Sequence, residues 1–270
     1  MNKTIVFKCG GSVIRELSDT FYENVRSLQA AGFKLAIVHG GGPEITDMLQ
    51  KLEVKTEFVD GQRKTTKPVL EVAEMVLSGT VNKYFVSELA KHDISSVGVS
   101  GKDGQMLVAD FLDQDVYGYV GEIKEVHPEM AEALMEKQFI PVIAPLSMTE
   151  EYQTLNVNAD LAASAVAGAM KADKLMFVTD VEGILKNGEL LDVVTEQEAL
   201  SLIDEGIISG GMIPKVQSAL SALSGDVDEV MIVNGKGSIF TGETFKGTRI
   251  VKKRRRSCES SLSNVWTVEC

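Results

Sequence analysis

Two kinds of hydrophobic pattern alternate along this chain. Short apolar runs rich in β-branched residues predict buried strands, and segments with apolar residues every three or four positions predict amphipathic helices. The expected strands cover 4–8, 34–39, 95–100, 139–145, 174–180 and 229–234, with an edge strand at 248–251. The expected helices cover 18–31, a segment opened by Pro43, then 67–91, 128–137, 158–171, 195–204 and 212–224. This alternation indicates an α/β protein with a mostly parallel sheet.

Two segments depart from this alternation. Residues 105–125 carry shorter apolar runs that predict paired strands. The Asn187-Gly188 pair predicts a two-residue hairpin turn, because both central positions of such a turn need a positive φ. Small antiparallel pieces are therefore expected beside the alternating strands and helices.

The chain shows no internal repeat and no linker that divides it. We expect one continuous domain over 1–251, with lobes at 1–165 and 166–251, because the motifs described below separate into two groups there. The tail at 252–270 differs, since KKRRRS is followed by residues without helical or strand periodicity. A basic run can tether a protein to nucleic acid or a membrane, but an unstructured end is the favoured interpretation.

Composition and charge exclude several classes of function. With 44% hydrophobic and 24% charged residues, the chain has ordinary globular usage. Acidic residues outnumber basic ones, 39 to 27, so the formal net charge is −12. A surface of that sign repels nucleic acid and anionic membranes, so neither is an expected partner. An anionic ligand has to be attracted by local cations and backbone N–H groups.

Cysteine usage and hydropathy bear on the compartment. The cysteines, Cys9, Cys258 and Cys270, are sparse and odd in number, which argues for a reducing environment. The N-terminal apolar run is too short and interrupted for a signal peptide, and no apolar stretch approaches the roughly 20 residues of a membrane span. A cytoplasmic protein is therefore expected.

Glycine, aspartate and lysine gather where the expected strands end. In a parallel sheet, ligands bind beyond the carboxyl ends of the strands, and a glycine there lets the backbone approach a phosphate. Five strand ends have this character: Lys8-Cys9-Gly10-Gly11, Gly40-Gly41-Gly42, Gly101-Lys102-Asp103-Gly104, Thr179-Asp180 and Asn234-Gly235-Lys236. The P-loop and dinucleotide fingerprints are absent, so an anion site of another kind is indicated.

Three cations occupy positions that favour a bound anion. Lys8 ends an apolar strand, where a buried lysine needs a partner, although it could also emerge into solvent there. Lys215 is expected in the first turn of a helix, where the dipole disfavours a cation unless an anion is bound; an exposed lysine is the alternative. Arg63 lies in a hairpin-like loop and can grip a carboxylate through two hydrogen bonds, or be a solvated loop residue.

The other candidates are polar residues beside these motifs. Asp160 is expected in the first turn of an alanine-rich helix, after Asn156 and Asn158, one of which should cap that helix. His39 precedes the triple glycine, and without nearby Cys/His spacing we interpret it as a packing or hydrogen-bonding residue rather than a metal ligand. Cys9 is interpreted as a buried small residue rather than a nucleophile.

Six motifs, taken in this order, resemble the amino acid kinase family. They are FKCGGS (7–12), HGGGP (39–43), GQRKT (61–65), NVNAD (156–160), TDVEG (179–183) and GGMIPK (210–215). The resemblance runs from about residue 3 to residue 251. It implies an open three-layer αβα sandwich with a mostly parallel central sheet of about eight strands, the amino acid kinase or carbamate kinase-like fold. It also implies an N-terminal lobe for the amino-acid substrate and dimer contact, and a C-terminal lobe for ATP.

The resemblance further implies transfer of the γ-phosphate of ATP to the γ-carboxylate of N-acetyl-L-glutamate, a step of arginine biosynthesis. Lys8 and Lys215 would flank the transferred group as catalytic residues, and Asp160 would hold both lysines in place. A carboxylate is already ionised near neutral pH and needs no general base. Catalysis would then consist of positioning, with cations and N–H groups aimed at the phosphoryl oxygens.

The binding residues also follow from the resemblance. Arg63 and Asn156 would bind the acceptor, together with backbone N–H groups of Gly41 and Gly42. The nucleotide and its phosphates would contact Lys8, Gly10, Gly11, Thr179, Asp180, Gly183, Gly210, Gly211, Met212 and Lys215. Mg²⁺ would be held mainly by the ATP phosphates, without a metal site in the protein.

The resemblance also predicts an oligomeric state, and two other functions are possible alternatives. By resemblance, the helix at 67–91 forms a homodimer contact, and the chain lacks the extra N-terminal helix of arginine-inhibited hexameric members, so an arginine-insensitive homodimer is expected. One rival is a sister kinase acting on glutamate, carbamate or UMP. The other is a nucleotide- or anion-binding protein without turnover, against which the trio Lys8, Asp160 and Lys215 argues.

Overall fold

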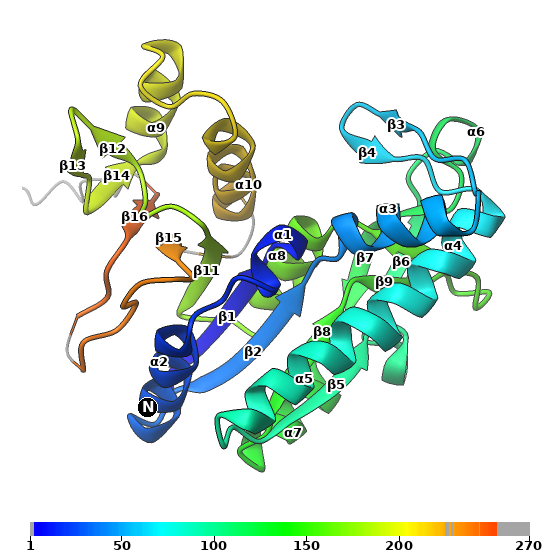
Figure 1. The fold of residues 1–270 in the computed structure, drawn as a ribbon, viewed down its shortest axis with the longest axis horizontal. Coiled ribbons are helices and arrows are strands. Elements are labelled where there is room, and N and C mark those ends of the chain that lie inside the picture. The colour runs from blue at the N-terminus through cyan, green and yellow to red at the C-terminus, as the bar shows by residue number, and fades with distance from the viewer. Residues whose placement is uncertain (1–2, 225–226, 228, 243, 253–270) are drawn as a thin grey trace, which may run out of the picture.

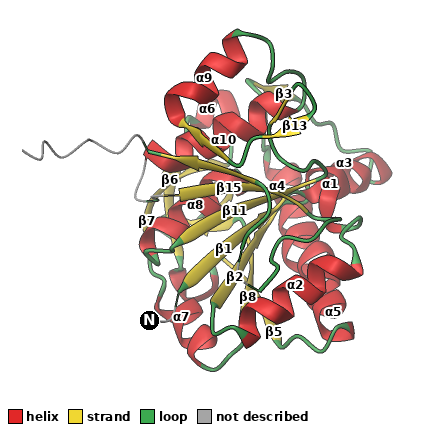
Figure 2. Ribbon diagram, turned by 90° about the vertical axis from the view of Figure 1, so that its left-hand side faces the viewer, coloured by secondary structure: helices red, strands yellow, loops and turns green. Residues whose placement is uncertain are grey.

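The computed structural model describes residues 3–224, 227, 229–242 and 244–252. The tail predicted at 252–270 lies outside the described residues, except for Lys252. In the described part, one layer of strands lies between two layers of helices (Figure 1, Figure 2). No helix in this part has the length and apolar character needed to cross a membrane. The predicted three-layer α/β fold is confirmed.

The central sheet has eight strands. Their order is β14 (Val193–Thr195), β16 (Thr248–Val251), β15 (Glu229–Asn234), β11 (Lys174–Thr179), β1 (Thr4–Cys9), β2 (Lys34–His39), β8 (Ile140–Ala144) and β5 (Ser96–Ser100). All neighbours are parallel except β15 and β16. The expectation of an edge strand at 248–251 is wrong, because β16 lies between β15 and β14. The edge strand on that side, β14, spans three residues, which is too short for its pattern to predict a strand.

The sheet joins the two predicted lobes. β1 comes from the first lobe and pairs with β11 of the second over five residue pairs, from Ile5–Lys174 to Cys9–Val178. The carboxyl ends of both strands therefore open onto the same edge of the sheet. The lobe boundary near residue 165 stays a prediction.

Alternate strand residues face opposite helix layers. On β1, Ile5 and Phe7 belong to one core and Val6 to the other. The first core is covered by α1 (Gly11–Ile14), α2 (Asp19–Ala30), α3 (Gly42–Lys51), α4 (Lys67–Glu74) and α5 (Asn82–Lys91). The second is covered by α7 (Glu129–Glu136), α8 (Ala159–Ala169), α9 (Glu196–Asp204) and α10 (Met212–Ser224). Burial on both faces explains why the strands are almost continuously apolar.

The long helix predicted at 67–91 is not uniform. α4 leads into a π-helical segment, η1 (Met75–Val81), before α5 begins at Asn82. Bonds from residue i to i+5 widen these turns, so residues four and five apart share one face. Leu77, Val81 and Asn82 are all buried. Short π segments often mark functional sites, and this one packs beside the glycine-rich turn after β2.

Four further strands form a small closed barrel: β6 (Leu107–Phe111), β7 (Val120–Val126), β9 (Leu146–Met148) and β10 (Thr154–Val157). The antiparallel β6–β7 pair confirms the paired strands predicted within 105–125. A short 3₁₀ turn, η2 (Asp103–Gln105), precedes β6, and α6 (Gln114–Tyr117) separates β6 from β7. The strands β9 and β10 are too short for their pattern to have predicted them.

Two hairpins stand apart from both sheets. One joins β3 (Phe58–Val59) to β4 (Gln62–Arg63), and the other joins β12 (Leu185–Lys186) to β13 (Glu189–Leu190). Asn187 and Gly188 have φ of 56° and 83°, so the turn predicted at this pair is confirmed. The first hairpin carries Arg63 to the carboxyl edge of the central sheet, beside the turn after β2.

Candidate active site

The carboxyl end of β1 and the first turn of α8 bring Lys8 and Asp160 together. Lys8 Nζ lies 2.6 Å from an Asp160 carboxylate oxygen, with the two side chains 16% and 26% exposed. Asn158 caps α8 by accepting from the Asp160 N–H, which fixes where the carboxylate stands. The second carboxylate oxygen of Asp160 accepts a hydrogen bond from the Ser218 hydroxyl at 3.0 Å. Lys8 is thus an ammonium held at a set position, close to where a side chain on Gly10 would begin.

Lys215 pairs with a different carboxylate from the one expected. Its Nζ lies 2.6 Å from Asp180, just after β11, and this hydrogen bond lowers the pKa of Asp180. The expectation that Asp160 holds both lysines is therefore wrong for this structure. Ser218, on the same helix as Lys215, occupies the second oxygen of Asp160, whereas Asp180 meets the first turn of α10.

The glycine turns after β1 and β2 touch each other. A Cβ on Gly11 would lie 2.8 Å from the Gly41 nitrogen and 3.0 Å from the Gly42 nitrogen, so only glycine fits at position 11. The Gly40 N–H donates to the Cys9 carbonyl, which ties the turns together. Gly41 and Gly42 stand at the start of α3, where the first N–H groups have no intrahelical acceptor. This is a suitable place for phosphoryl or carboxylate oxygens.

Arg63 is the most deeply buried cation of the site, at 9% exposed. Its guanidinium donates to the Gly42 carbonyl at 3.1 Å, to Thr46 Oγ1 at 2.7 Å and to Thr56 Oγ1 at 2.9 Å. It also lies over the Phe58 ring, 4.7 Å from the centroid. Burial lowers its pKa. All three acceptors are neutral, and no ion pair of the described residues includes Arg63, so it offers uncompensated positive charge.

A cavity of about 190 Å³ lies between the Gly40–Gly42 turn, the β3–β4 hairpin and the start of α8. Arg63, on the β3–β4 hairpin, and Asn156, on β10 of the barrel, both line it. Asn156, on β10, donates to Thr65 Oγ1 at 3.2 Å, which orients its amide. The structure thus brings the two predicted acceptor-binding side chains to one cavity beside Gly41 and Gly42.

The residues predicted for the nucleotide divide into three groups. Thr179 is buried, and its hydroxyl bonds to the Val181 and Val233 carbonyls, so it shapes the turn after β11. Gly183 has φ of 146°, and a Cβ there would lie 2.5 Å from Thr248 Oγ1, so it also serves the local backbone. In the second group, Asp180 follows β11, Gly210 and Gly211 lie in the loop before α10, and Met212 and Lys215 lie in the first turn of α10. Lys8, Gly10 and Gly11 lie at the carboxyl end of β1.

Comparison with known proteins agrees with this geometry. Residues 3–234 match the sequence model of the amino acid kinase family. The chain belongs to this family. It is 97% identical over 254 residues to the acetylglutamate kinase of Bacillus pumilus, covering 94% of this chain and 98% of that protein. The acetylglutamate kinase of Bacillus subtilis is 69% identical, with the same coverage of both chains.

Solved structures of the family share the architecture. The crystal structure of smu.665 from Streptococcus mutans has a TM-score of 0.79 and 34% identity, covering 93% of this chain and 99% of that chain. Carbamate kinase from Giardia lamblia has a TM-score of 0.66 at 16% identity, covering 93% and 99%. The second likeness shows the fold alone. The predicted amino acid kinase fold is confirmed.

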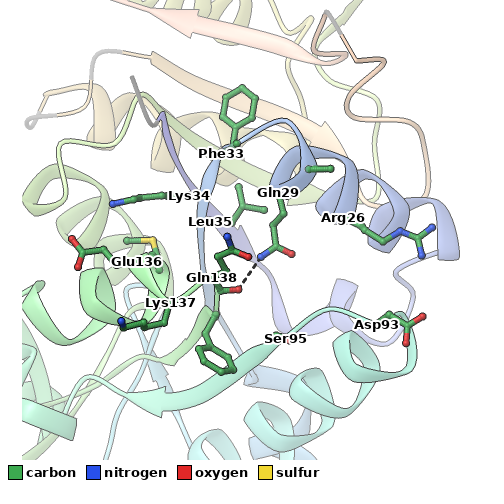
Figure 3. Close-up of a pocket in the computed structure, with 14 residues that line it drawn as sticks. Arg26, Gln29, Phe33, Lys34, Leu35, Asp93, Ser95, Glu136, Lys137 and Gln138 are labelled. Carbon is green, nitrogen blue, oxygen red and sulfur yellow. Dashed lines mark hydrogen bonds between the residues drawn. The ribbon is translucent and has the colours of Figure 1, made fainter.

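A second and larger cavity has a volume of about 830 Å³, and Figure 3 shows the side chains that line it. Its lining mixes Arg26, Lys34 and Lys137 with Asp93 and Glu136. Gln29, on α2, donates through its side-chain amide to the backbone carbonyl of Gln138 at 3.3 Å. None of the residues predicted for the site lines it, and it lies at the amino ends of the strands. Among the predicted site residues, Gly41, Gly42, Arg63 and Asn156 line the smaller cavity instead.

Several supporting residues were missed by the sequence analysis. Thr46 and Thr56 orient Arg63, Thr65 orients Asn156, and Ser218 holds Asp160. Each acts through one hydroxyl. Serine and threonine are common throughout the chain, so no local pattern distinguishes these four; only their spatial neighbours do.

No group of three or more His, Cys, Asp or Glu side chains in the described part of the chain could hold a metal ion. The residues present therefore do not make a protein-based metal site.

Proposed function

We propose that this chain transfers the γ-phosphate of ATP to the γ-carboxylate of N-acetyl-L-glutamate, the reaction that serves arginine biosynthesis. One observation carries the proposal. A buried arginine that has no carboxylate partner among the described residues lies in the same cavity as the glycine turn after β2. The turn after β1, with Lys8, adjoins that turn. The acetylglutamate kinase relatives support the choice of substrate.

The chemistry required is an in-line displacement. One oxygen of the acceptor carboxylate forms a bond to the γ-phosphorus, the bond from that phosphorus to the β,γ-bridging oxygen breaks, and ADP leaves with the electron pair. The products are an acyl phosphate and ADP. No proton has to be removed from the ionised acceptor, so the site needs cations and N–H donors rather than a base.

Lys8 and Lys215 supply those cations from opposite lobes. Lys8 is held by Asp160, and Lys215 by Asp180. The Lys215–Asp180 pair is the more exposed of the two, with side chains 31% and 56% accessible, so Lys215 exchanges its carboxylate for phosphate oxygens at small cost. Asp160 acts as an organiser of Lys8, not as a general base.

Acceptor selection falls to Arg63 and Asn156. The guanidinium pairs with the α-carboxylate of the acceptor, and Asn156 contacts the acetamido end. Glutamate without its acetyl group carries an ammonium at that position, which would face the Arg63 charge at close range. The arrangement favours an acylated amino acid over a free one.

We also propose a cytoplasmic homodimer that uses the outer face of α4, η1 and α5. The exposed apolar side chain of Met75, 58% accessible, lies on that face. Light scattering on the wild type should give the mass of two chains, and Met75→Asp should shift the mass toward one chain. A monomeric wild type at micromolar concentration would remove this part of the proposal.

The deciding experiment is an acyl-phosphate assay. Purified protein, MgATP and N-acetyl-L-glutamate are incubated with hydroxylamine, with glutamate, carbamate and UMP as parallel acceptors followed by ADP release. Hydroxamate formed with N-acetyl-L-glutamate alone is the expected result. Turnover with a different acceptor would keep the kinase mechanism and reject the substrate. ATP binding without turnover on any acceptor would favour a non-catalytic binding protein.

A further inference from the structure

A buried histidine lies directly beneath the glycine turn after β2. His39 is fully buried, and its Nδ1 lies 2.9 Å from the Gly40 carbonyl oxygen. Its Nε2 lies 3.1 Å from the Asn82 side-chain nitrogen, at the start of α5. A carbonyl oxygen only accepts and an amide nitrogen only donates. Nδ1 therefore carries the proton and donates to Gly40, while Nε2 accepts from Asn82.

Asn82 is held rigidly, so it fixes the imidazole. Its side-chain nitrogen also lies 2.8 Å from the Val142 carbonyl of β8 and 3.1 Å from the Val99 carbonyl of β5. Its oxygen accepts from Lys83 Nζ at 3.1 Å. A Cβ on Gly98 would lie 1.9 Å from this oxygen. Only a glycine at this position of β5 therefore leaves space for the Asn82 side chain.

The contact to Gly40 controls the next amide. In a trans peptide, the carbonyl of Gly40 and the N–H of Gly41 point in opposite directions. Holding the carbonyl toward His39 therefore turns the Gly41 N–H away from the imidazole. The Gly41 nitrogen would lie 2.8 Å from a Cβ on Gly11, and a Cβ at Gly41 would meet Leu77 at 2.8 Å and Val81 at 3.2 Å. The Gly40–Gly41 peptide is therefore closely packed between the glycine turn after β1 and the π segment η1, which leaves it little freedom to rotate.

We propose that His39 is a positioning residue for phosphoryl transfer, holding the Gly40–Gly41 peptide so that the Gly41 N–H faces the reacting oxygens. Asn82 sets the tautomer and orientation of the imidazole. This inference rests on the proposed function, since the Gly41 N–H matters for rate only if charge develops beside it. A correctly aimed N–H donor acts mainly in the transition state, so its loss lowers kcat more than it raises KM.

A matched pair of variants separates the two hydrogen bonds of His39. The amide nitrogen of His39→Asn can stand near Nδ1 and keep the bond to Gly40, whereas His39→Gln reaches the place of Nε2 and keeps the contact to Asn82. We expect His39→Gln to lose about 10- to 100-fold in kcat with KM for both substrates changed less than about threefold, and His39→Asn to retain most of the wild-type kcat. Each variant loses one buried bond, so their thermal midpoints should be similar.

Equal losses of kcat in both variants, or kcat values that follow the thermal midpoints, would reduce His39 to a packing residue. A measurement that does not need turnover uses ¹⁵N NMR on the unliganded protein. The wild-type imidazole should show protonated Nδ1 and unprotonated Nε2, and the Gly41 amide signal should move in His39→Gln but not in His39→Asn. Protonated Nε2 would overturn the proposal.

The two readouts also separate this inference from the proposed function. A wild type that fails to phosphorylate N-acetyl-L-glutamate rejects the function. In that case the NMR result still decides whether His39 sets the Gly41 amide, and an unmoved Gly41 signal in His39→Gln rejects the positioning role whatever the enzyme does.

Discussion

At the scale of single residues, Lys8 and Arg63 differ in their ion-pair and hydrogen-bond partners. Lys8 is paired with a carboxylate 2.6 Å away, so the pair carries little net charge toward an arriving ligand. Arg63 bonds only to neutral oxygens among the described residues, so its charge is uncompensated. A cation that is already paired with a carboxylate stabilises mainly the charge that develops in the transition state. An unpaired cation attracts the carboxylate of the substrate already in the ground state. The two residues should therefore affect different kinetic constants.

Replacing Lys8 by methionine keeps the length of the side chain and removes the charge. We expect kcat to fall by about 100-fold or more, with KM for N-acetyl-L-glutamate changed little. Initial-rate kinetics with hydroxylamine trapping measure both constants. A variant with the wild-type kcat would show that Lys8 does not face the transferred group.

Arg63→Ala should raise KM for N-acetyl-L-glutamate by about 10- to 100-fold, because a charge-assisted pair is lost, and leave kcat near the wild-type value. Arg63→Lys is the matched control, since it keeps the charge without the planar fork. We expect it to recover only part of the affinity. Similar KM values for wild type and Arg63→Ala would move the acceptor carboxylate elsewhere.

His39 makes a prediction about pH and stability. Burial lowers its pKa from 6.5 to about 4, opposed by the bond to Gly40 and aided by the nearby Lys83 charge. The unfolded chain binds the proton first as pH falls, so the stabilisation is complete above pH ~6.5 and is lost between there and ~4, by up to about 3 kcal/mol. Urea unfolding of the wild type and His39→Asn across this window should converge toward low pH. Parallel curves would contradict the assignment.

At the scale of elements, the strands meet the site where their apolar pattern stops. β1 and β2 are mostly buried and end in glycine turns that touch, and α3 begins there without a side-chain cap for its first N–H groups. The π segment η1 lets Leu77, Val81 and Asn82 share one face toward this point. The geometry of this site is set by the positions at which strands and helices end. A substitution inside one strand or helix can therefore displace a site residue that it does not contact.

Gly98→Ala tests such a change in β5. The added Cβ would lie 1.9 Å from the Asn82 oxygen and 2.7 Å from Lys83 Nζ, so Asn82 has to move. We expect a loss of stability of about 1–3 kcal/mol from overpacking and a fall in kcat through the displaced His39. Gly79→Ala, where nothing lies within 4 Å of the new Cβ, is the control. An unchanged kcat in Gly98→Ala would uncouple Asn82 from the site.

At the scale of the whole molecule, one sheet brings Lys8, on β1, and Asp180, after β11, to the same edge. Lys8 and Lys215 are held there by different carboxylates, Asp160 and Asp180. The formal net charge of −12 opposes anionic substrates at long range. Binding of ATP and an anionic acceptor therefore depends on these local cations and on the glycine N–H groups between them.

Lys215→Met should separate catalysis from stability. Its ion pair with Asp180 is largely exposed, so the free energy of unfolding should change by less than about 0.5 kcal/mol. We expect kcat to fall by about 100-fold, because the variant removes a cation from the transferred group. Denaturant titration and initial rates on the same preparation check both values. A large stability loss would mean that the pair is structural.

The sequence by itself determined the α/β alternation, the glycine turns at the strand ends and the candidates Lys8, Asp160 and Arg63, because these depend on local periodicity and on residues adjacent along the chain. Only the tertiary structure decided that Lys215 pairs with Asp180, that β16 lies inside the sheet, and that His39 meets Asn82. His39 and Asn82 are 43 positions apart, and Asp160 and Ser218 are 58 apart. Contacts between residues this far apart in the sequence depend on how the helices and strands pack together, and local sequence patterns carry no information about that packing.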